Sequence, residues 1–333
     1  MADIATYYDT QYRILIDSAE EDQLYQVVDG RKIFRLDHQA DTLLRKLSLP
    51  SSAAILDYGC AKGGTLKRAL AKRGDLRVHL FDVSEMYLPF WRTFIDEEHW
   101  AVYQPKESWD GRFDVVTSFF SLEHVVEPRA MLGDVARMLK PGGTFYGIVP
   151  NTFANTADFV VSDHVNHFSA TSLSVLLETS GFRVVDIDDR AHASAFVFVA
   201  IADGSNGMPP SRTQEVAAVG REVAGIADYW RTFAERVQAF EGAHTGRPAA
   251  VYGSGFYGTY LATCLMDAGA IRCFVDRSPF RQGKTLFDRP IIAPEDLPDV
   301  IATVYVGLNP RHARTEIGKV SCWSHRPLDC FYP

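Results

Sequence analysis

Between Ser52 and Ala202, short apolar runs alternate with helix-like segments, and this alternation constrains the fold more than any other feature of the sequence. Such alternation is typical of a parallel β-sheet whose faces are covered by helices. The runs are "AAILDYG", "RVHLFDV", "FDVVTSFF", "GTFYGIVP", "FRVVDID" and "SAFVFVAI", and the helix candidates lie near 65–73, 86–98, 128–139 and 170–180. The sequence therefore predicts a doubly wound α/β domain.

The chain of 333 residues is long enough for a second domain, since single cores rarely keep growing past roughly 250 to 300 residues. The stretch "DGSNGMPPSRT" is rich in Gly, Pro and Ser and indicates a linker. A shorter alternation, "AAVYGSG", "IRCFVD" and "DVIATVYVGL", follows Pro248. We predict four parts: a helical N-terminal lid (1–50), the doubly wound domain (51–202), a linker with a long helix (203–245) and a smaller α/β domain (246–333).

The long helix is predicted from apolar residues that recur at alternating spacings of three and four. They are Val216, Val219, Val223, Ile226, Trp230, Phe233, Val237 and Phe240. Such a stripe packs either against the chain's own domains or against a second copy. A connecting helix is the favoured interpretation, and a homodimer seam is the alternative.

Charge and cysteine content exclude several classes of partner. A net charge of −8 gives no general field that would attract nucleic acid or an anionic membrane. The five cysteines include no C-x-x-C pair, so neither a disulfide framework nor a zinc site is indicated. The N-terminus lacks the pattern of a signal peptide, and no run of 18 or more apolar residues occurs. We therefore expect a cytoplasmic protein.

A glycine-rich loop follows the first strand of the large domain, in "AAILDYGCAKGGTLKRAL". The strand ends at Asp57, a turn containing Gly59 and Gly63 comes next, and a helix begins near Thr65. Such a turn lets the backbone approach a ligand closely. The next apolar run ends at Asp82, where a carboxylate could accept both hydroxyl groups of a ribose.

Two later segments, "FDVVTSFFSLEHVVEP" and "MLKPGGTFYGIVPN", follow in the same order. Together the four segments resemble the class I (Rossmann-like) methyltransferases that use S-adenosyl-L-methionine and release S-adenosyl-L-homocysteine. The resemblance implies that Asp57 orients the methionine ammonium through the loop and that Asp82 holds the ribose. The implied cofactor-binding residues are Asp57, Gly59, Cys60, Ala61, Gly63, Asp82 and Val83.

One departure from that family lies in the loop, where Ala61 stands at a position that often holds a third glycine. Alanine can follow the turn if its φ is negative, so this departure changes the shape of the loop without ruling out cofactor binding. A sulfonium loses its methyl group without a protein-bound metal, and the acidic residues show no obvious metal-binding spacing. We therefore expect a metal-free reaction.

Two places offer an acid–base group. His124 follows a strand at its carboxyl end, where ligands bind in open α/β sheets. In "VVSDHVNHFSATSL", Asp163 stands next to His164, and a carboxylate can orient an imidazole and make it more basic. We predict His124 and His164 as base candidates with Asp163 orienting His164. The alternatives are that these residues cap or pack the following helices, or that they bind a metal.

A narrower resemblance rests on "DHVNHFS" (163–169), "VYGSGFYG" (251–258) and "FVDRSPFRQGK" (274–284). These segments resemble sugar C-methyltransferases of deoxysugar and related glycan pathways. In those enzymes a base removes the proton next to a sugar ketone, and the enolate attacks the methyl group. That family commonly carries an N-terminal zinc module with clustered cysteines, whereas this chain has no cysteine before Cys60. The acceptor atom therefore stays open, with carbon favoured over oxygen.

The resemblance implies a nucleotide-linked sugar substrate in deoxysugar, capsule or lipopolysaccharide biosynthesis. The predicted substrate contacts are Tyr8, Glu123, Asn151, Asn166 and His167; Tyr7, Arg31, Arg35 and His38 are weaker candidates from the N-terminal lid. One alternative is a methyltransferase for another small metabolite. Another is a non-catalytic nucleotide-binding assembly protein that dimerises through the long helix.

Gly253, Gly255 and Gly258 match the G-x-G-x-x-G fingerprint of dinucleotide-binding proteins, and Asp276 ends the next apolar run. The region after Pro248 has room for about one mononucleotide-binding half, whereas a dinucleotide needs two. A purely structural turn is the favoured interpretation. Contact with a phosphate or a nucleotide sugar comes second, and NAD binding third.

Overall fold

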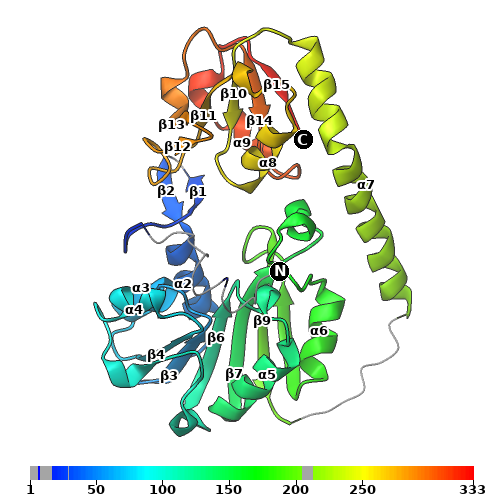
Figure 1. Ribbon diagram of the computed structural model, residues 1–333. Coiled ribbons are helices and arrows are strands. Elements are labelled where there is room, and N and C mark those ends of the chain that lie inside the picture. The colour runs from blue at the N-terminus through cyan, green and yellow to red at the C-terminus, as the bar shows by residue number, and fades with distance from the viewer. Residues whose placement is uncertain (1–6, 8–16, 29, 205–212) are drawn as a thin grey trace. The chain divides into compact units, whose positions relative to one another are not determined.

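The computed structural model describes residues 7, 17–28, 30–204 and 213–333. Contacts divide the chain into two compact units. The first contains Met1–Thr152 and Asp158–Val216, and the second contains Phe153–Ala157 and Ala217–Pro333. Each unit has its own β-sheet with helices (Figure 1), so the predicted α/β fold class with a second α/β domain is confirmed.

The sheet of the first unit has seven strands in the order β5-β4-β3-β6-β7-β9-β8. Neighbours from β5 to β7 are parallel, whereas β9 runs antiparallel to both β7 and β8. The strands are β3 (Ala54–Tyr58), β4 (Arg77–Asp82), β5 (Trp100–Val102), β6 (Phe113–Phe119), β7 (Leu139–Pro150), β8 (Phe182–Asp188) and β9 (Ala195–Ala202).

Helices cover both faces of this sheet because alternate strand residues point to opposite sides. One core joins Leu56 and Val116 to α5 and α6. The other joins Ile55 and Val115 to α2, α3 and α4. The helices are α2 (Arg35–Lys46), α3 (Gly64–Lys72), α4 (Leu88–Trp91), α5 (Pro128–Met138) and α6 (Ala170–Glu178).

The N-terminal region differs from the helical lid that we expected. β1 (Leu24–Val28) and β2 (Arg31–Phe34) form an antiparallel hairpin before α2. In place of the helix expected near 86–98, the structure has the 3₁₀ turn Glu85–Tyr87, the short α4 and a second 3₁₀ turn, Glu97–His99. Such short segments hold too few residues for a hydrophobic period to show which structure they adopt.

The second unit contains a six-stranded sheet in the order β12-β13-β11-β10-β14-β15. Its four central strands, β13, β11, β10 and β14, are parallel, as is β15, and helices pack on both faces. The strands are β10 (Ala249–Tyr252), β11 (Ile271–Val275), β12 (Thr285–Leu286), β13 (Arg289–Ile292), β14 (Thr303–Val306) and β15 (Asp329–Phe331); the helices are α7 (Thr213–Ala243), α8 (Phe256–Cys264) and α9 (Ala313–Gly318).

The apolar stripe on α7 divides into two halves. Phe233 and Val237 are buried in the core of the second unit. Val216 and Val223, near the start of the helix, are 63% and 36% exposed. The later half of the stripe is therefore a packing surface within the chain, and the homodimer stays a prediction.

In the glycine turn after β10, the glycines are needed because backbone segments pack closely against one another. A Cβ on Gly258 would lie 1.9 Å from the carbonyl oxygen of Gly253, and a Cβ on Gly307 would lie 2.3 Å from Cα of Gly258. Asp276 Oδ2 accepts hydrogen bonds from the backbone nitrogen and hydroxyl of Ser254 at 3.0 and 2.6 Å. The fingerprint thus serves close turn-to-helix packing, in line with a structural turn.

Candidate functional site

The first unit has a topological switch point beside β3. From β3 the chain passes to β4 and β5 on one side of the sheet and then to β6 on the other. Ligands of open α/β sheets bind outside the carboxyl ends of the strands at such a point. The residues that follow β3 and β6, the glycine loop and the segment around His124, therefore lie at the expected site.

Gly59 has a φ of +74°, in the left-handed region. A Cβ here would lie 2.0 Å from Ser121 Oγ, so only glycine fits between the two segments. Gly63, with a φ of +68°, precedes α3, and its Cβ would lie 2.7 Å from Leu80 Cδ1. Both glycines are required by the conformation of the loop.

Ala61 has a φ of +46°, so it does not follow the turn with the negative φ that suits an alanine. This conformation costs a non-glycine residue roughly 1–2 kcal/mol. Two hydrogen bonds hold it: the Ala61 backbone nitrogen donates to Asp82 Oδ2 at 2.7 Å, and Trp91 Nε1 donates to the Ala61 carbonyl at 2.7 Å. The surrounding structure thus imposes the turn that a glycine would adopt freely.

Two buried carboxyl groups border the loop. Burial raises the pKa of Asp57 to about 8; the hydrogen bond from Thr117 Oγ1 opposes this shift, and the charge of Asp82 adds to it. Burial also raises the pKa of Asp82, to about 6, although the backbone N–H groups of Ala61, Val83 and Ser84 favour the ionised form. At pH 7 the Asp82 carboxylate is therefore mostly charged, and Asp57 is mostly neutral.

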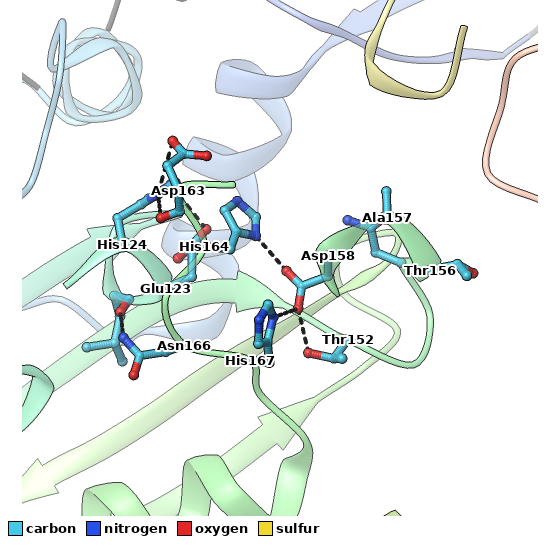
Figure 2. A network of polar contacts seen from close by, with 12 residues as sticks. Glu123, His124, Thr152, Thr156, Ala157, Asp158, Asp163, His164, Asn166 and His167 are labelled. Atoms are coloured by element: carbon cyan, nitrogen blue, oxygen red, sulfur yellow. Dashed lines mark hydrogen bonds and ion pairs between the residues drawn. The ribbon is translucent and has the colours of Figure 1, made fainter. Parts of the chain in front are cut away.

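His164 is oriented by Asp158, which lies within the 3₁₀ turn Thr156–Val160. Asp158 is fully buried, and its Oδ1 lies 2.7 Å from His164 Nδ1 (Figure 2). Its Oδ2 lies 3.0 Å from His167 Nδ1 and accepts from Thr152 Oγ1 at 2.6 Å. Burial opposes ionisation, but the hydrogen bonds from His164, His167 and Thr152 outweigh it and lower the pKa of Asp158 to about 2.

The consequence for His164 is a defined tautomer. A carboxylate accepts only, so Nδ1 of His164 must be the donor in this pair. In the neutral ring Nε2 then has its lone pair available to take a proton. The His164 side chain is 13% exposed, so this nitrogen belongs to a largely buried base.

His124, on the 3₁₀ turn Leu122–His124, forms a second pair. Its Nδ1 lies 3.0 Å from the Asp163 carbonyl oxygen and 3.5 Å from Asp163 Oδ2. Burial lowers the pKa of His124, with the Asp163 charge acting against this and His164 acting with it. The rings of His124 and His164 meet edge to face, with centroids 4.8 Å apart. The two predicted bases therefore lie in one cluster.

Glu123 is the buried carboxyl group of this cluster. Glu123 is 1% exposed, and its Oε2 has no hydrogen-bond partner among the residues that the structure describes. Burial raises its pKa well above the usual range, and the charge of Asp158 acts in the same direction. Burial thus favours the protonated form of Glu123, which has an O–H group to donate.

The pairing differs from the one predicted from sequence: Asp158 contacts His164, and Asp163 contacts His124. Neighbouring side chains in an irregular segment point in different directions, so adjacency in sequence was a poor guide. No motif marked Asp158; only its presence six positions before His164 in a segment rich in His and Asp could have suggested it.

The other predicted contacts have mixed surroundings. Asn166 Nδ2 donates to the carbonyls of Val125 and Leu122 at 2.6 and 3.3 Å, which fastens its segment to the turn of His124. The backbone nitrogen of Asn151 donates to the Ser194 carbonyl. Tyr8 lies outside the described residues. For Tyr7, one of the weaker candidates, burial and the charge of Asp163 raise the pKa of the phenol.

Three of these residues also meet the distance requirement for a metal site. Glu123, His124 and His164 each offer a ligand atom, and these atoms lie within 4.8 Å of one another. The same three groups suit proton transfer, since each imidazole already has an acidic residue at Nδ1. The metal-free reaction stays a prediction.

Comparisons with known proteins find methyltransferases. Residues 33–187 match the family described as a methyltransferase domain. C-methyltransferase NovU of Streptomyces niveus is 29% identical over 201 residues, which cover 55% of this chain and 48% of NovU. A ubiquinone biosynthesis O-methyltransferase of Xanthomonas campestris is 35% identical over 118 residues, covering 34% of this chain and 47% of that protein. The chain thus spans about half the length of these curated relatives.

Among solved structures, an S-adenosylmethionine-dependent methyltransferase from Mesorhizobium loti aligns with 50% of this chain and all of its own, at 17% identity and a TM-score of 0.41. Residues 33–187 thus match a methyltransferase domain, over slightly less than half of the chain. Within the described residues, no helix has both the length and the apolar character needed to cross a membrane.

Proposed function

We propose that the protein is a methyltransferase that transfers a methyl group from S-adenosylmethionine to a carbon next to the ketone of a nucleotide-linked sugar, in deoxysugar, capsule or lipopolysaccharide biosynthesis. The observation that carries this proposal is the buried Asp158–His164 pair, which packs against His124 shortly after the carboxyl end of β6. Similarity to a protein named as a C-methyltransferase supports the choice of carbon.

The residues around the loop fit the cofactor. Gly59 brings the backbone close without a side chain, and the Asp82 carboxylate can accept ribose hydroxyl groups. Asp57 lies beneath the loop, where its carboxyl can orient the methionine ammonium through the backbone. When bound, S-adenosylmethionine supplies an electrophilic methyl group.

His164 supplies the general base in this reaction. Its Nε2 takes the proton from the carbon next to the ketone while Asp158 stabilises the imidazolium that forms. The electron pair of the broken C–H bond would pass into the enolate, whose carbon would take the methyl group as the sulfur–methyl bond breaks and its electron pair stays on the sulfur of S-adenosylhomocysteine. The proton stays on His164 until it is released to solvent.

Glu123 and His124 are the groups that recognise the acceptor oxygens. The unpartnered Oε2 of Glu123 is buried, and buried polar atoms are nearly always hydrogen-bonded. A sugar hydroxyl or keto oxygen satisfies it, and a neutral carboxyl can donate to an oxygen on which negative charge develops. An apolar acceptor would leave this group without a partner.

Incubation of a panel of keto-sugar nucleotides in deuterated water tests the acceptor atom. We expect exchange of the proton next to the ketone, and with S-adenosylmethionine a C-methylated product, in the presence of EDTA throughout. Methylation without such exchange would indicate O-methylation, which the similarity to an O-methyltransferase favours as the alternative. Activity that EDTA abolishes and a divalent cation restores would contradict the metal-free mechanism.

Cofactor affinity is expected to decrease as the pH is lowered through about 6. Because burial raises the pKa of Asp82 to about 6, this carboxylate is protonated well above the pH at which a free aspartate would be, and it then accepts ribose hydroxyls poorly. Calorimetry with S-adenosylhomocysteine between pH 5 and 8 measures the effect. Asp82→Asn should bind more weakly and lose the change near pH 6; a variant with wild-type affinity and pH dependence would contradict the ribose assignment.

A further inference from the structure

Five residues of the loop after β7, Phe153–Ala157, belong to the second compact unit by their contacts. The residues on either side, Thr152 and Asp158, belong to the first. The chain thus leaves the methyltransferase unit for five residues and returns to it at the aspartate that orients His164.

Three side chains of the second unit form hydrogen bonds with this segment: those of Trp230, Asn309 and Tyr257. Trp230 Nε1 on α7 donates to the Thr156 carbonyl at 2.7 Å. Asn309 Nδ2, which follows β14, donates to the Ala154 carbonyl at 2.8 Å. Contacts to main-chain atoms fix the path of the backbone whatever the side chains of the segment do.

Tyr257, in the first turn of α8, makes the contact nearest to Asp158. Its hydroxyl accepts from the Ala157 backbone nitrogen at 2.8 Å and donates to Asn155 Oδ1 at 3.2 Å. Its ring stacks on Trp230, with centroids 6.1 Å apart and an angle of 19° between the planes. The glycine turn before α8 therefore places Tyr257 where its hydroxyl forms hydrogen bonds with the segment 153–157.

Ala157 is bonded directly to Asp158, and Figure 2 shows the two in one short turn. Consecutive Cα atoms are held about 3.8 Å apart, so a displacement of Ala157 reaches Asp158 without attenuation by a flexible side chain. Asp158 has little freedom to compensate, because both of its oxygens are engaged by His164, His167 and Thr152.

We propose that Tyr257 is a positioning residue for the base: by holding the Ala157 nitrogen it sets the place of Asp158 and thereby the orientation of His164. This rests on the function proposed above. It gives the "GSGFYG" turn a role that requires no bound nucleotide.

Tyr257→Phe tests the proposal, since it removes the hydroxyl and keeps the ring that stacks on Trp230. The matched control is Tyr260→Phe on the same helix; Tyr260 packs edge to face on Trp230, with centroids 5.0 Å apart, and its hydroxyl makes no hydrogen bond within the described residues. In Tyr257→Phe the ring proton signals of His164 and His167 in NMR spectra should move, and kcat should fall on the order of tenfold. KM and the affinity for S-adenosylhomocysteine should stay within twofold. Tyr260→Phe should match the wild type in all four.

Trp230→Phe provides a second test, because it removes the donor to the Thr156 carbonyl and should move the same two histidine signals. Unchanged signals of His164 and His167 in Tyr257→Phe, or equal changes in Tyr260→Phe, would overturn the proposal. The NMR result does not depend on finding the acceptor. If no acceptor is methylated even by the wild type, the proposed function fails while shifted histidine signals still support the role of Tyr257.

Discussion

His164→Gln is expected to lower kcat by about 10²- to 10⁴-fold, the range that a positioned general base contributes. Glutamine can still donate to the Asp158 carboxylate, so the fold should keep this buried hydrogen bond, but it cannot take the proton from the acceptor. Affinity for S-adenosylhomocysteine should change less than twofold, because the proposed cofactor contacts lie in the loop after β3 and at the end of β4. Steady-state kinetics and calorimetry measure the two effects separately.

His167→Gln is the comparison variant, since His167 contacts the other oxygen of the same carboxylate. Its ring packs against that of Phe159, with centroids 4.6 Å apart. Because His167 is also a predicted substrate contact, this variant should raise KM and lower kcat by a smaller factor than His164→Gln. His124→Gln should lower kcat by a smaller factor than His164→Gln, because burial lowers the pKa of His124 and so weakens this imidazole as a base. Full activity in both His164→Gln and His124→Gln would refute the proposed acid–base cluster.

Much of the fold could be predicted from hydrophobic pattern because long apolar runs bury both faces of a parallel strand. Six of the seven strands of the large sheet correspond to runs quoted from the sequence. Strand β5, "WAV", is too short to show a pattern. The antiparallel placement of β9 between β7 and β8 has no sequence pattern of its own, because neither direction nor strand order changes which residues are apolar.

The sequence indicated which residues gather at the candidate site, but it did not indicate which carboxylate contacts which histidine. Glycines that need a positive φ, and acids that end parallel strands, follow from local chemistry, and Gly59, Gly63 and Asp82 were found in this way. The partner of His164 depends on how the segment after β7 turns back, which no local pattern encodes. Ala61 shows the same limit, because its left-handed φ is imposed by Asp82 and Trp91 from elsewhere in the fold.

The cofactor loop depends most heavily on Gly59, for two independent reasons. Its φ of +74° costs an L-residue about 1–2 kcal/mol. The Cβ of an alanine would also lie 2.0 Å from Ser121 Oγ and 2.7 Å from Ser121 Cβ. The hydroxyl could rotate away, but Cβ is fixed to the backbone, so the glycine loop or the segment before His124 must move.

Gly59→Ala should therefore weaken S-adenosylhomocysteine binding by at least about tenfold, since each 1.4 kcal/mol of strain or displacement corresponds to a factor of ten. Gly74→Ala is the matched control, because its Cβ would meet nothing within 4 Å, and its affinity should equal the wild-type value. Adding Ser121→Gly to Gly59→Ala removes the clash and leaves the strain in φ. The double variant should recover part of the affinity, and the part that stays lost measures what the left-handed turn contributes. Wild-type affinity in Gly59→Ala would mean that the cofactor does not depend on this close approach of the backbone.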